Sequence, residues 1–356
     1  MSQAENIRHE ADKILQAISK GQKPSLSLPK RVLANVLYDK KRGFFTLGKG
    51  ITSRSITSIK IFAQTLQMMA LSKEAVETNE EITKREAYYV SKNWGPARFD
   101  EQQESDAVIE DLEALFKVHR EALSFSAEEK GGEVAGELKV EDKDRETGAK
   151  IEIDCSKFGT GAYSIPTNVE HLTFQTNAKF VLAIETAGMF QRLHNHYYWR
   201  KSNSILISMG GVPTRACRRF TRRLSDTCNL PVYVFTDNDP WGVSTIYRTL
   251  KAGSANAAHI NENFCVPRAT FLGVTPYDVD DYNLPTHPLT EVDIKRIDDL
   301  LKNDPFFIAH KEWQKALKKM ASSGVRAEQQ SLAMHGLNYV MDTYLPEKLA
   351  NKNFLP

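Results

Sequence analysis

Two aspartates separated by one residue, Asp237 and Asp239, directly follow the short apolar run Val232–Phe235. The β-branched and aromatic residues of that run predict a buried strand of a parallel sheet. Carboxylates held this close repel each other unless a proton or a cation lies between them. Because the ligands offered are all oxygens, we expect a hard cation, Mg²⁺ with several retained waters. The alternative is an acidic loop or a helix N-cap, where Asp is common.

A third carboxylate, Glu185, ends a second apolar run over residues 180–184. In open α/β sheets, ligands bind beyond the carboxyl ends of the parallel strands. Glu185, Asp237 and Asp239 are therefore the predicted metal ligands. Three more aspartates follow an expected strand at residues 269–274 and are interpreted as a solvated or structural loop, although they could add to the site: Asp278, Asp280 and Asp281.

Adjacent tyrosines on an expected helix, Tyr88 and Tyr89, follow Arg85 at a spacing of three and four residues. A phenol with a pKa of about 10 is a poor nucleophile at neutral pH. Arg85 could stabilise the phenolate of a nearby tyrosine and neutralise an attacked phosphate. From these residues alone, packing in a core or groove is the simpler interpretation of the pair.

The runs Ile184–Leu193 and Thr236–Gly242 together resemble the Toprim domain of the topoisomerase VI A subunits. That family includes the protein that makes meiotic double-strand breaks. The resemblance extends from about residue 55 to the C-terminus. It implies that Tyr89 is the catalytic nucleophile assisted by Arg85, because the family has an arginine, an aromatic residue and then the catalytic tyrosine at this spacing. Tyr88 would be the packing neighbour.

The segment Thr186–Ser225 contains eight Lys and Arg residues and no Asp or Glu. Five arginines recur at helical spacing and should share one face of a helix: Arg215, Arg218, Arg219, Arg222 and Arg223. Unpaired guanidinium groups suit phosphates, which they bind in a bidentate manner. This helix is therefore the predicted DNA-binding surface, and a merely solvated basic face is the alternative.

The pattern of elements predicts an α/β protein. Residues 1–54 are interpreted as a small N-terminal extension. Residues 55–155 are expected to form a winged-helix (CAP-like) domain that carries Tyr89, with a β-hairpin around residues 146–148 as its wing. Residues 156–356 are expected to form a Rossmann-like Toprim domain with a parallel sheet, which binds the metal.

Composition limits where this protein acts and what it binds. The net charge is +2 and the pI about 8.2, so any binding of nucleic acid must come from local clusters of charge. The four cysteines fit no Cys-x-x-Cys pattern, which favours reduced thiols in a cytosolic protein over a structural zinc site. The sequence shows neither a signal-peptide core nor an apolar run of membrane-spanning length. We expect a cytoplasmic protein associated with the nucleoid and no contact with a membrane.

The resemblance implies the DNA-cleaving subunit of an ATP-dependent type IIB topoisomerase, an isomerase that relaxes or decatenates DNA. Mg²⁺-assisted attack by Tyr89 would make a transient double-strand break with a 5′-phosphotyrosyl linkage. The implied partners are double-stranded DNA, an ATPase B subunit and a second copy of this chain, in an A2B2 heterotetramer. ATP binding is assigned to the B subunit because the sequence has no Gly-x-x-x-x-Gly-Lys-Ser/Thr motif.

Three alternatives remain from the sequence. The first is a Toprim nuclease that cuts DNA without resealing it, and the second is a non-catalytic DNA-binding scaffold. The third is another Toprim enzyme, such as a primase or an RNA-maturation nuclease. The Arg85–Tyr89 spacing argues against this last class, because such an enzyme would not need it.

Overall fold

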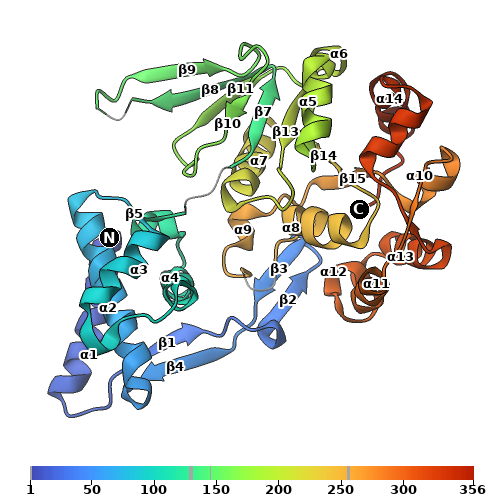
Figure 1. The fold of residues 1–356 in the computed structure, drawn as a ribbon. Helices are drawn as coiled ribbons and strands as arrows, with labels where there is room; N and C mark the ends of the chain where they lie inside the picture. The colour runs from blue at the N-terminus through green and yellow to red at the C-terminus, as the bar shows by residue number, and fades with distance from the viewer. Residues whose placement is uncertain (1, 128–130, 145, 255–256) are drawn as a thin grey trace. The chain divides into compact units, whose positions relative to one another are not determined.

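The computed structural model describes residues 2–127, 131–144, 146–254 and 257–356. The chain forms two compact units, each assembled from separate stretches of sequence; Figure 1 labels their elements. Unit 1 consists of Met1–Leu37, Phe45–Glu129 and Ala255–Glu262, and unit 2 consists of Tyr38–Phe44, Lys130–Ser254 and Asn263–Pro356. The elements that cross these limits are β2 (Val36–Asp39), β3 (Phe44–Leu47) and α9 (Asn261–Phe264).

Unit 1 is mainly helical. Its elements are α1 (Gln3–Ser19), β1 (Ser25–Pro29), η1 (Leu33–Asn35), β4 (Ile51–Ser55), η2 (Ile56–Ser58), α2 (Ile59–Thr78), β5 (Ile82–Thr83), α3 (Lys84–Val90), η3 (Ser91–Asn93), η4 (Gly95–Ala97), α4 (Gln102–Phe116), η5 (Arg120–Leu123) and β6 (Phe125–Ser126). Strands β1 and β4 pair in antiparallel fashion, and β5 and β6 pair in parallel. The apolar faces of α2 and α4 meet in one core that includes Met68 and Leu112. Burial of this apolar surface is the main favourable term in the folding of the unit.

The N-terminal residues belong to this core, so the structure does not show residues 1–54 as a separate extension. Ile7 and Ile14 of α1 and Leu26 of β1 are buried in the same cluster as α2. Arg8 also forms a 3.2 Å ion pair with Glu77 at the end of α2. The apolar stripe of α1 is completed by helices far along the chain, and for that reason its own sequence did not reveal the packing.

A segment from the second half of the chain also packs in unit 1. Nε2 of His259 lies 3.4 Å from Oε2 of Glu113 on α4, and both side chains are buried. Asn261 donates a 3.0 Å hydrogen bond from Nδ2 to the carbonyl oxygen of Phe45. Unit 1 is therefore complete only when residues 257–262 have joined it.

Helix α3, which carries the two tyrosines, has a well-defined start. Thr83 and Glu86 form a capping box, in which each side chain accepts the backbone N–H of the other residue. Such caps satisfy N–H groups that the first helical turn leaves unpaired. Lys84 forms a 2.6 Å ion pair with Asp106 of α4. These contacts fix both where α3 begins and which face it presents to α4.

Unit 2 is built on a six-stranded sheet in the order β10–β7–β13–β12–β14–β15. The strands are β7 (Glu133–Gly136), β10 (Tyr163–Ser164), β12 (Phe180–Ile184), β13 (Ser204–Ser208), β14 (Val232–Phe235) and β15 (Ala269–Gly273). The last four are parallel, with Ile184 opposite Phe235 at the ends of β12 and β14. Strands β7 and β10 extend the sheet in antiparallel fashion. The predicted parallel sheet is confirmed.

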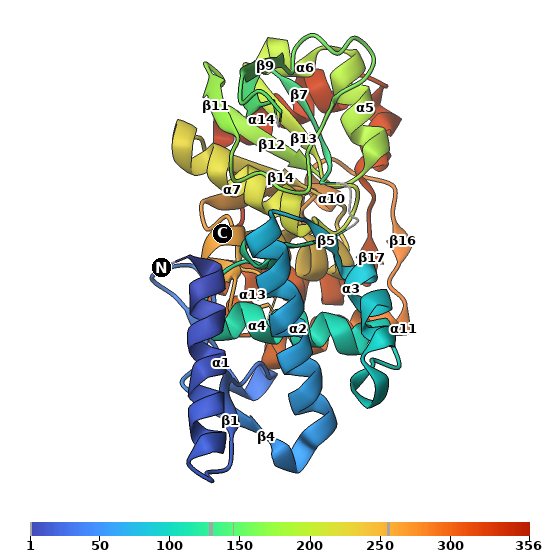
Figure 2. The same cartoon turned by 90° about the vertical axis from the view of Figure 1, so that its left-hand side faces the viewer.

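Helices cover both faces of this sheet, and Figure 2 shows α7 in front of the strands and α14 behind them. The helices and helical turns are α5 (Ala187–Asn195), α6 (Tyr198–Ser202), α7 (Arg215–Cys228), η6 (Gly242–Tyr247), α8 (Arg248–Lys251), α10 (Pro276–Asp281), α11 (Glu291–Asn303), α12 (Pro305–Ala309), α13 (Lys311–Ser323), η7 (Gln329–His335), η8 (Val340–Tyr344) and α14 (Leu345–Asn351). Alternate residues of β12, such as Leu182 and Ile184, pack with Phe190 of α5 and Leu345 of α14. A strand pair, β16 (His287–Pro288) and β17 (Val325–Arg326), brackets helices α11 to α13.

The hairpin predicted as the wing of a winged helix exists, but it belongs to unit 2. Strand β8 (Leu138–Lys143) pairs with β9 (Lys150–Asp154), and its other edge pairs with β11 (Thr173–Thr176). The domain boundary expected near residue 155 is therefore wrong, and the two units divide near residue 130. Alternating residues identified the hairpin correctly, but local alternation does not show which third strand pairs with its free edge.

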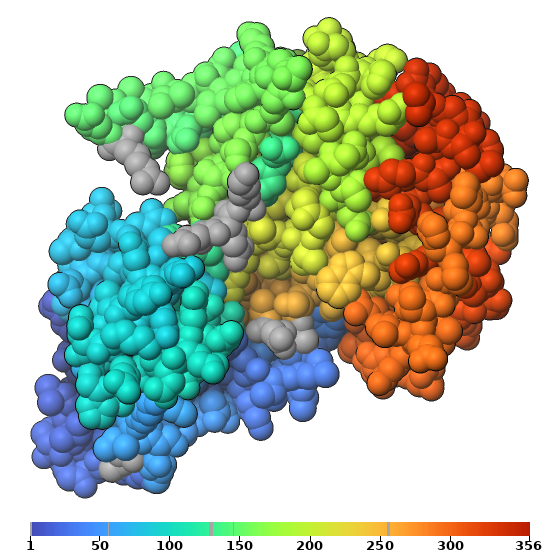
Figure 3. Space-filling model, viewed as in Figure 1, coloured from blue at the N-terminus to red at the C-terminus, as the bar shows by residue number. Residues whose placement is uncertain are grey.

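The C-terminal segment forms one side of unit 2, the orange and red surface in Figure 3, and its residues Leu332 and Leu345 belong to the core of that unit. Its main polar anchor is Asp278 of α10, which is fully buried. Lys348 of α14 contacts both carboxylate oxygens of Asp278, at 2.9 and 3.2 Å, and the hydroxyl of Tyr344 donates to Oδ2 at 2.8 Å. The exposed Asp280 instead pairs with Lys319. The structural interpretation of these aspartates is supported.

In the part of the chain that the structure describes, no helix is long and apolar enough to cross a bilayer.

We predict that Lys348→Met lowers the free energy of unfolding by roughly 3 kcal/mol, because it leaves the carboxylate of Asp278 buried without its cation. Lys319→Met is the matched control and should cost less than about 1 kcal/mol, because its partner is exposed. Thermal or urea unfolding of both variants measures the difference. Equal losses would contradict the assignment of Asp278 and Lys348 as the anchor of α14.

Candidate functional site

The predicted metal ligands lie at the carboxyl ends of two adjacent parallel strands. Glu185 directly follows β12, and Asp237 comes two residues after the end of β14. The backbone N–H of Glu185 donates to the carbonyl oxygen of Phe235 at 3.0 Å. The backbone N–H of Asp237 donates to Oε2 of Glu185 at 2.9 Å. The structure therefore brings these two carboxylates together, as the sequence predicted.

Asp239 lies in the turn that leads into η6. Its Oδ1 accepts the backbone N–H of Gly242 at 2.6 Å. A Cβ at position 242 would lie only 3.0 Å from the carbonyl oxygen of Asp237 and 3.3 Å from Oδ1 of Asp239. Gly242 thus allows the backbone to approach both aspartates closely, and it is needed for the tight turn after the Asp-x-Asp pair.

A residue that the sequence analysis missed completes the site. The backbone N–H of Gln329 donates to Oδ1 of Asp237 at 2.8 Å, across 92 residues of sequence. Its buried side chain also bonds to Phe235 and Thr186 at the ends of β14 and β12. No motif near Gln329 signals this role, because the contact depends on how the C-terminal segment returns to the sheet.

The electrostatics of the site follow from burial and crowding. Burial raises the pKa of Glu185 to about 7. The hydrogen bond from the N–H of Asp237 lowers this pKa, whereas the negative charges of Asp237 and Asp239 raise it further. Burial likewise raises the pKa of Asp237 to about 6. The hydrogen bond from the N–H of Gln329 lowers this pKa, and the negative charge of Asp239 raises it. The pKa of Asp239 is also raised, mainly by burial. Each carboxylate is thus costly to ionise without a compensating cation.

The donor set fits Mg²⁺, since it consists of carboxylate oxygens whose charge a cation would stabilise. Among the described residues, no three Asp, Glu, His or Cys side chains lie close enough to surround an ion by themselves. This arrangement suits Mg²⁺ better than a cation that needs a full protein cage, because Mg²⁺ keeps several waters and commonly takes one or two carboxylates. Glu185 and Asp237, which the N–H of Asp237 joins, are the residues that would hold it. The third predicted ligand, Asp239, lies in the following turn, and the described residues do not bring the three carboxylates into one cluster.

In unit 1 the two tyrosines have different surroundings. Tyr88 packs against the core, its hydroxyl donates to the carbonyl oxygen of Asp100 at 3.0 Å, and the Lys92 ammonium lies 4.0 Å from its ring centre. The side chain of Tyr89 is 57% exposed, and its ring meets that of Tyr88 edge-on at 5.3 Å. Arg85, one helical turn before Tyr89, is exposed as well. Tyr88 therefore has a packing role, and Tyr89 is accessible to a large substrate.

The arginines of α7 are more engaged than the sequence suggested. Arg219 forms a bidentate ion pair with Glu170 at 2.5 and 2.7 Å, and Arg222 pairs with Asp226 at 2.5 Å. Arg223 donates to the carbonyl oxygens of Val169 and Leu172. Arg218 is only 5% exposed, and Arg215 is half-buried. The expectation of unpaired arginines is wrong for Arg219 and Arg222, because their acidic partners lie outside the acid-free segment Thr186–Ser225.

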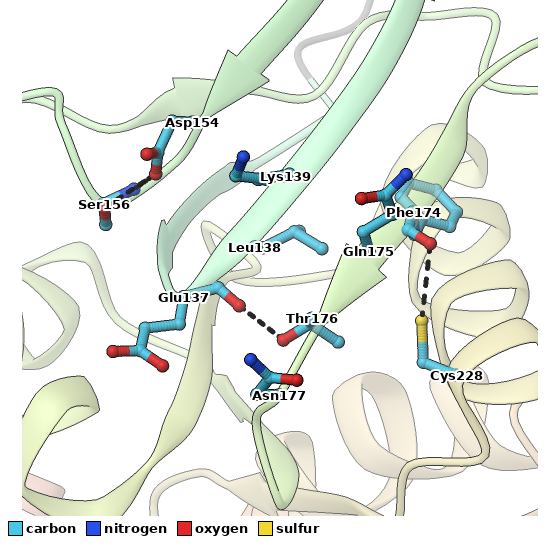
Figure 4. Close-up of a pocket in the computed structure, with 10 residues that line it drawn as sticks. All are labelled: Glu137, Leu138, Lys139, Asp154, Ser156, Phe174, Gln175, Thr176, Asn177 and Cys228. Carbon is cyan, nitrogen blue, oxygen red and sulfur yellow. Dashed lines mark hydrogen bonds between the residues drawn. The ribbon is translucent and has the colours of Figure 1, made fainter.

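A cavity of about 650 Å³ between β8, β9 and β11 lies apart from the carboxylates (Figure 4). Its polar groups are largely paired with each other. Thr176 donates to the carbonyl oxygen of Glu137, and the hydroxyl of Ser156 donates to Asp154 at 2.6 Å. Lys139 pairs with Glu152 at 2.8 Å. None of the predicted ligands lines this cavity, so its size alone does not make it the functional site.

Comparison with known proteins defines the class. A family model for type IIB DNA topoisomerases matches residues 60–125, and a model for the all-beta domain of the DNA topoisomerase VI alpha subunit matches residues 128–178. A third model, the Toprim domain of the topoisomerase 6 A subunit and Spo11, matches residues 180–349. The second match supports placing the β8–β9 hairpin outside the helical unit. The chain is one of the subunits of a type IIB DNA topoisomerase.

Whole-chain relatives specify the family within that class. The A subunit of type 2 DNA topoisomerase 6 from Methanocaldococcus jannaschii is 53% identical over 345 residues, which cover 96% of this chain and 93% of the relative. The corresponding proteins of Methanothermobacter thermautotrophicus and Pyrococcus abyssi are 39% identical over 342 residues and 37% identical over 364 residues. These alignments cover 95% and 97% of this chain and 94% and 93% of the two relatives. The chain belongs to the family of topoisomerase VI A subunits.

The raised pKa of Glu185 gives a pH prediction. In EDTA, the unfolded state ionises this group near its usual pKa of about 4.5, whereas the folded state holds its proton until about pH 7. Glu185 therefore destabilises the metal-free fold increasingly as the pH rises between these values. Relative to the wild type, we expect the free energy of unfolding of Glu185→Gln to increase by on the order of 1–2 kcal/mol between pH 5 and pH 8.

Thermal unfolding at both pH values measures this gain. Glu146→Gln, at an exposed position, is the matched control and should show no such gain. If the stability difference between Glu185→Gln and the wild type is the same at pH 5 and pH 8, ionisation of Glu185 does not destabilise the fold.

Proposed function

We propose that Tyr89 is the nucleophile with which this protein cleaves DNA. The observation that carries the proposal is the contrast between two adjacent phenols on one helix. The hydroxyl of Tyr88 is committed to the carbonyl oxygen of Asp100, while the side chain of Tyr89 extends into solvent. The capping box and the Lys84–Asp106 ion pair fix the orientation of α3, so that Tyr89 and Arg85 lie on its exposed side.

The proposed reaction is a transesterification that conserves the number of phosphodiester bonds. The phenolic oxygen of Tyr89 attacks a backbone phosphorus as its proton leaves to solvent, and a bond forms between them. The bond from phosphorus to the 3′-oxygen breaks, and that oxygen takes up a proton, leaving the 5′ end attached to the protein. Arg85 stabilises the phenolate and the charge on the attacked phosphate. The reverse reaction reseals the strand without a high-energy cofactor.

The acidic edge of unit 2 serves the same reaction in this proposal. Glu185, Asp237 and Asp239 hold Mg²⁺, which when bound supplies positive charge to stabilise the transition state and to position the scissile phosphate. The ligand oxygens are oriented by backbone N–H donors from Asp237, Gly242 and Gln329. Such preorganised donors avoid the cost of rearranging the site during reaction.

The proposed assembly is a homodimer of this chain with an ATPase B subunit, in an A2B2 heterotetramer. Two copies would cut the two DNA strands together, each tyrosine acting with the metal site of its partner. ATP would bind to the B subunit and drive strand passage, so that the complex relaxes or decatenates DNA. Family membership supports this arrangement.

We predict that Tyr89→Phe abolishes covalent attachment to DNA and leaves DNA affinity nearly unchanged, because one phenolic oxygen is lost and the charged surface is not. The test is incubation of the A2B2 complex with supercoiled DNA, Mg²⁺ and ATP, followed by denaturant and detection of protein-linked breaks. Tyr88→Phe is the matched control and should retain attachment. Loss of attachment in Tyr88→Phe alone would assign the nucleophile to the other tyrosine.

The same assay separates the proposed topoisomerase from the other interpretations of the sequence. Protein-linked breaks would exclude a non-catalytic scaffold. Relaxed, covalently closed DNA that appears only with ATP would exclude a nuclease that does not reseal its breaks. Free linear DNA as the final product, without attached protein, would contradict the proposed function.

A role for α7 in binding DNA is a separate proposal. Its arginines also bond to other parts of unit 2, so each could have a structural role as well. The carboxylates of Glu170 and Asp226 already pair with Arg219 and Arg222, so part of the positive charge of this helix is compensated within the protein. The engaged groups also hold the loops at residues 169–172 and 263–265 in place. The helix stabilises unit 2 through these contacts, and in this proposal some of its arginines also contact DNA phosphates.

We predict that the double variant Arg219→Gln/Arg222→Gln changes two quantities. The log–log slope of DNA affinity against salt should decrease by up to about two units, or about 0.9 for each phosphate that the variant no longer neutralises. The melting temperature should also fall, since the bonds to Glu170 and to the carbonyl oxygen of Cys265 are removed. A folded variant with a lower melting temperature and the wild-type salt slope would show that these two arginines are structural only.

A further inference from the structure

The side chain of Gln329 is fully buried and joins the two acidic strand ends. Its Nε2 donates to the carbonyl oxygen of Phe235 at 2.7 Å, and its Oε1 accepts the hydroxyl of Thr186 at 3.0 Å. Phe235 ends β14, two residues before Asp237, and Thr186 directly follows Glu185. One amide group therefore connects the chain segments that carry both carboxylates.

The backbone around Gln329 makes a second set of contacts with the same loop. Its N–H donates to Oδ1 of Asp237 at 2.8 Å. Two residues earlier, Ala327 exchanges backbone hydrogen bonds of 2.8 and 3.2 Å with Asn238. Asp237 is thus fixed through Oδ1 of its side chain and through its neighbour in sequence.

The chemistry of an amide suits this position. It donates to one strand end and accepts from the other, and it adds no charge to a site that already holds three carboxylates. A carboxylate at position 329 would lack the donor and add a fourth negative charge. Without the amide, the Phe235 carbonyl would still accept the N–H of Glu185, but Thr186 would lose its acceptor. The main loss would be the link between the two strand ends.

We propose that Gln329 is a positioning residue that sets the spacing between Glu185 and Asp237 and thereby the affinity of the site for a divalent cation. This inference rests on the proposed role of those carboxylates as metal ligands. Groups that orient metal ligands from outside typically change metal affinity by about 10- to 100-fold when they are replaced. We expect a loss of about 10-fold, since the backbone N–H of Gln329 would still hold Asp237.

The test measures Mn²⁺ binding to the DNA-free, full-length protein from the electron paramagnetic resonance signal of the free ion. Gln329→Met keeps the shape of the side chain and removes both hydrogen bonds. Thr186→Val removes the bond to Gln329 from the other side, together with the cap that Thr186 gives the N–H of Met189 at the start of α5. It carries the test if the first variant does not fold. Met334→Ala, at a 53% exposed position of the same helical turn η7, is the matched control. Thermal unfolding in EDTA verifies that each variant is folded.

In the A2B2 complex, the Mg²⁺ concentration for half-maximal cleavage should rise by the same factor, while cleavage at saturating Mg²⁺ largely recovers. A merely structural defect would instead lower cleavage at every Mg²⁺ concentration. Weaker Mn²⁺ binding by Gln329→Met or Thr186→Val, with unchanged binding by Met334→Ala, supports the inference.

The variant Glu185→Gln distinguishes a failure of the positioning role of Gln329 from a failure of the metal site. If it weakens Mn²⁺ binding while the folded Gln329 and Thr186 variants bind as tightly as the wild type, the positioning role is overturned and the metal site stands. If Glu185→Gln binds Mn²⁺ as tightly as the wild type, the proposed metal site itself is wrong, and the inference falls with it.

Discussion

The parallel pairing of β12 with β14 is the constraint on which the functional half of this protein depends. Because Ile184 and Phe235 are in register, the residues that follow them emerge at the same edge of the sheet. The sheet thereby gathers negative charge that isolated loops would keep apart, and burial raises the pKa of each carboxylate. The stability of the surrounding core is what holds this unfavourable arrangement in place.

In unit 1, by contrast, the fold exposes a reactive group, because helix α3 holds Tyr89 at the surface. Successive side chains of a helix point in directions about 100° apart around its axis, so adjacent tyrosines meet different surroundings. One phenol faces the core and finds a backbone acceptor, and the next faces solvent. A capped start and one ion pair to α4 are enough to fix which tyrosine takes which environment.

Sequence reasoning succeeded where the determining interactions are local. The two apolar runs predicted buried parallel strands, and their acidic ends lie together as expected. It failed where the partner lies far along the chain. Nothing near residues 136–153 indicates that β11 completes their sheet, and the acid-free arginine segment obtains its carboxylates from Glu170 and Asp226. Gln329 was missed for the same reason, since its contacts span more than 90 residues.

The short segment that returns to unit 1 affects how the protein is made. Glu113 accepts the N–H of Arg120 within the same stretch of chain, but it also bonds to His259, and the carbonyl oxygen of Phe45 bonds to Asn261. Residues 259 and 261 are synthesised more than 140 residues after α4. By then the chain for β12, β13 and β14 has already been synthesised. The N-terminal unit therefore cannot finish folding first, as N-terminal domains generally do during synthesis. A fragment cut near residue 130 would lack these buried contacts and would be a poor substitute for the intact unit.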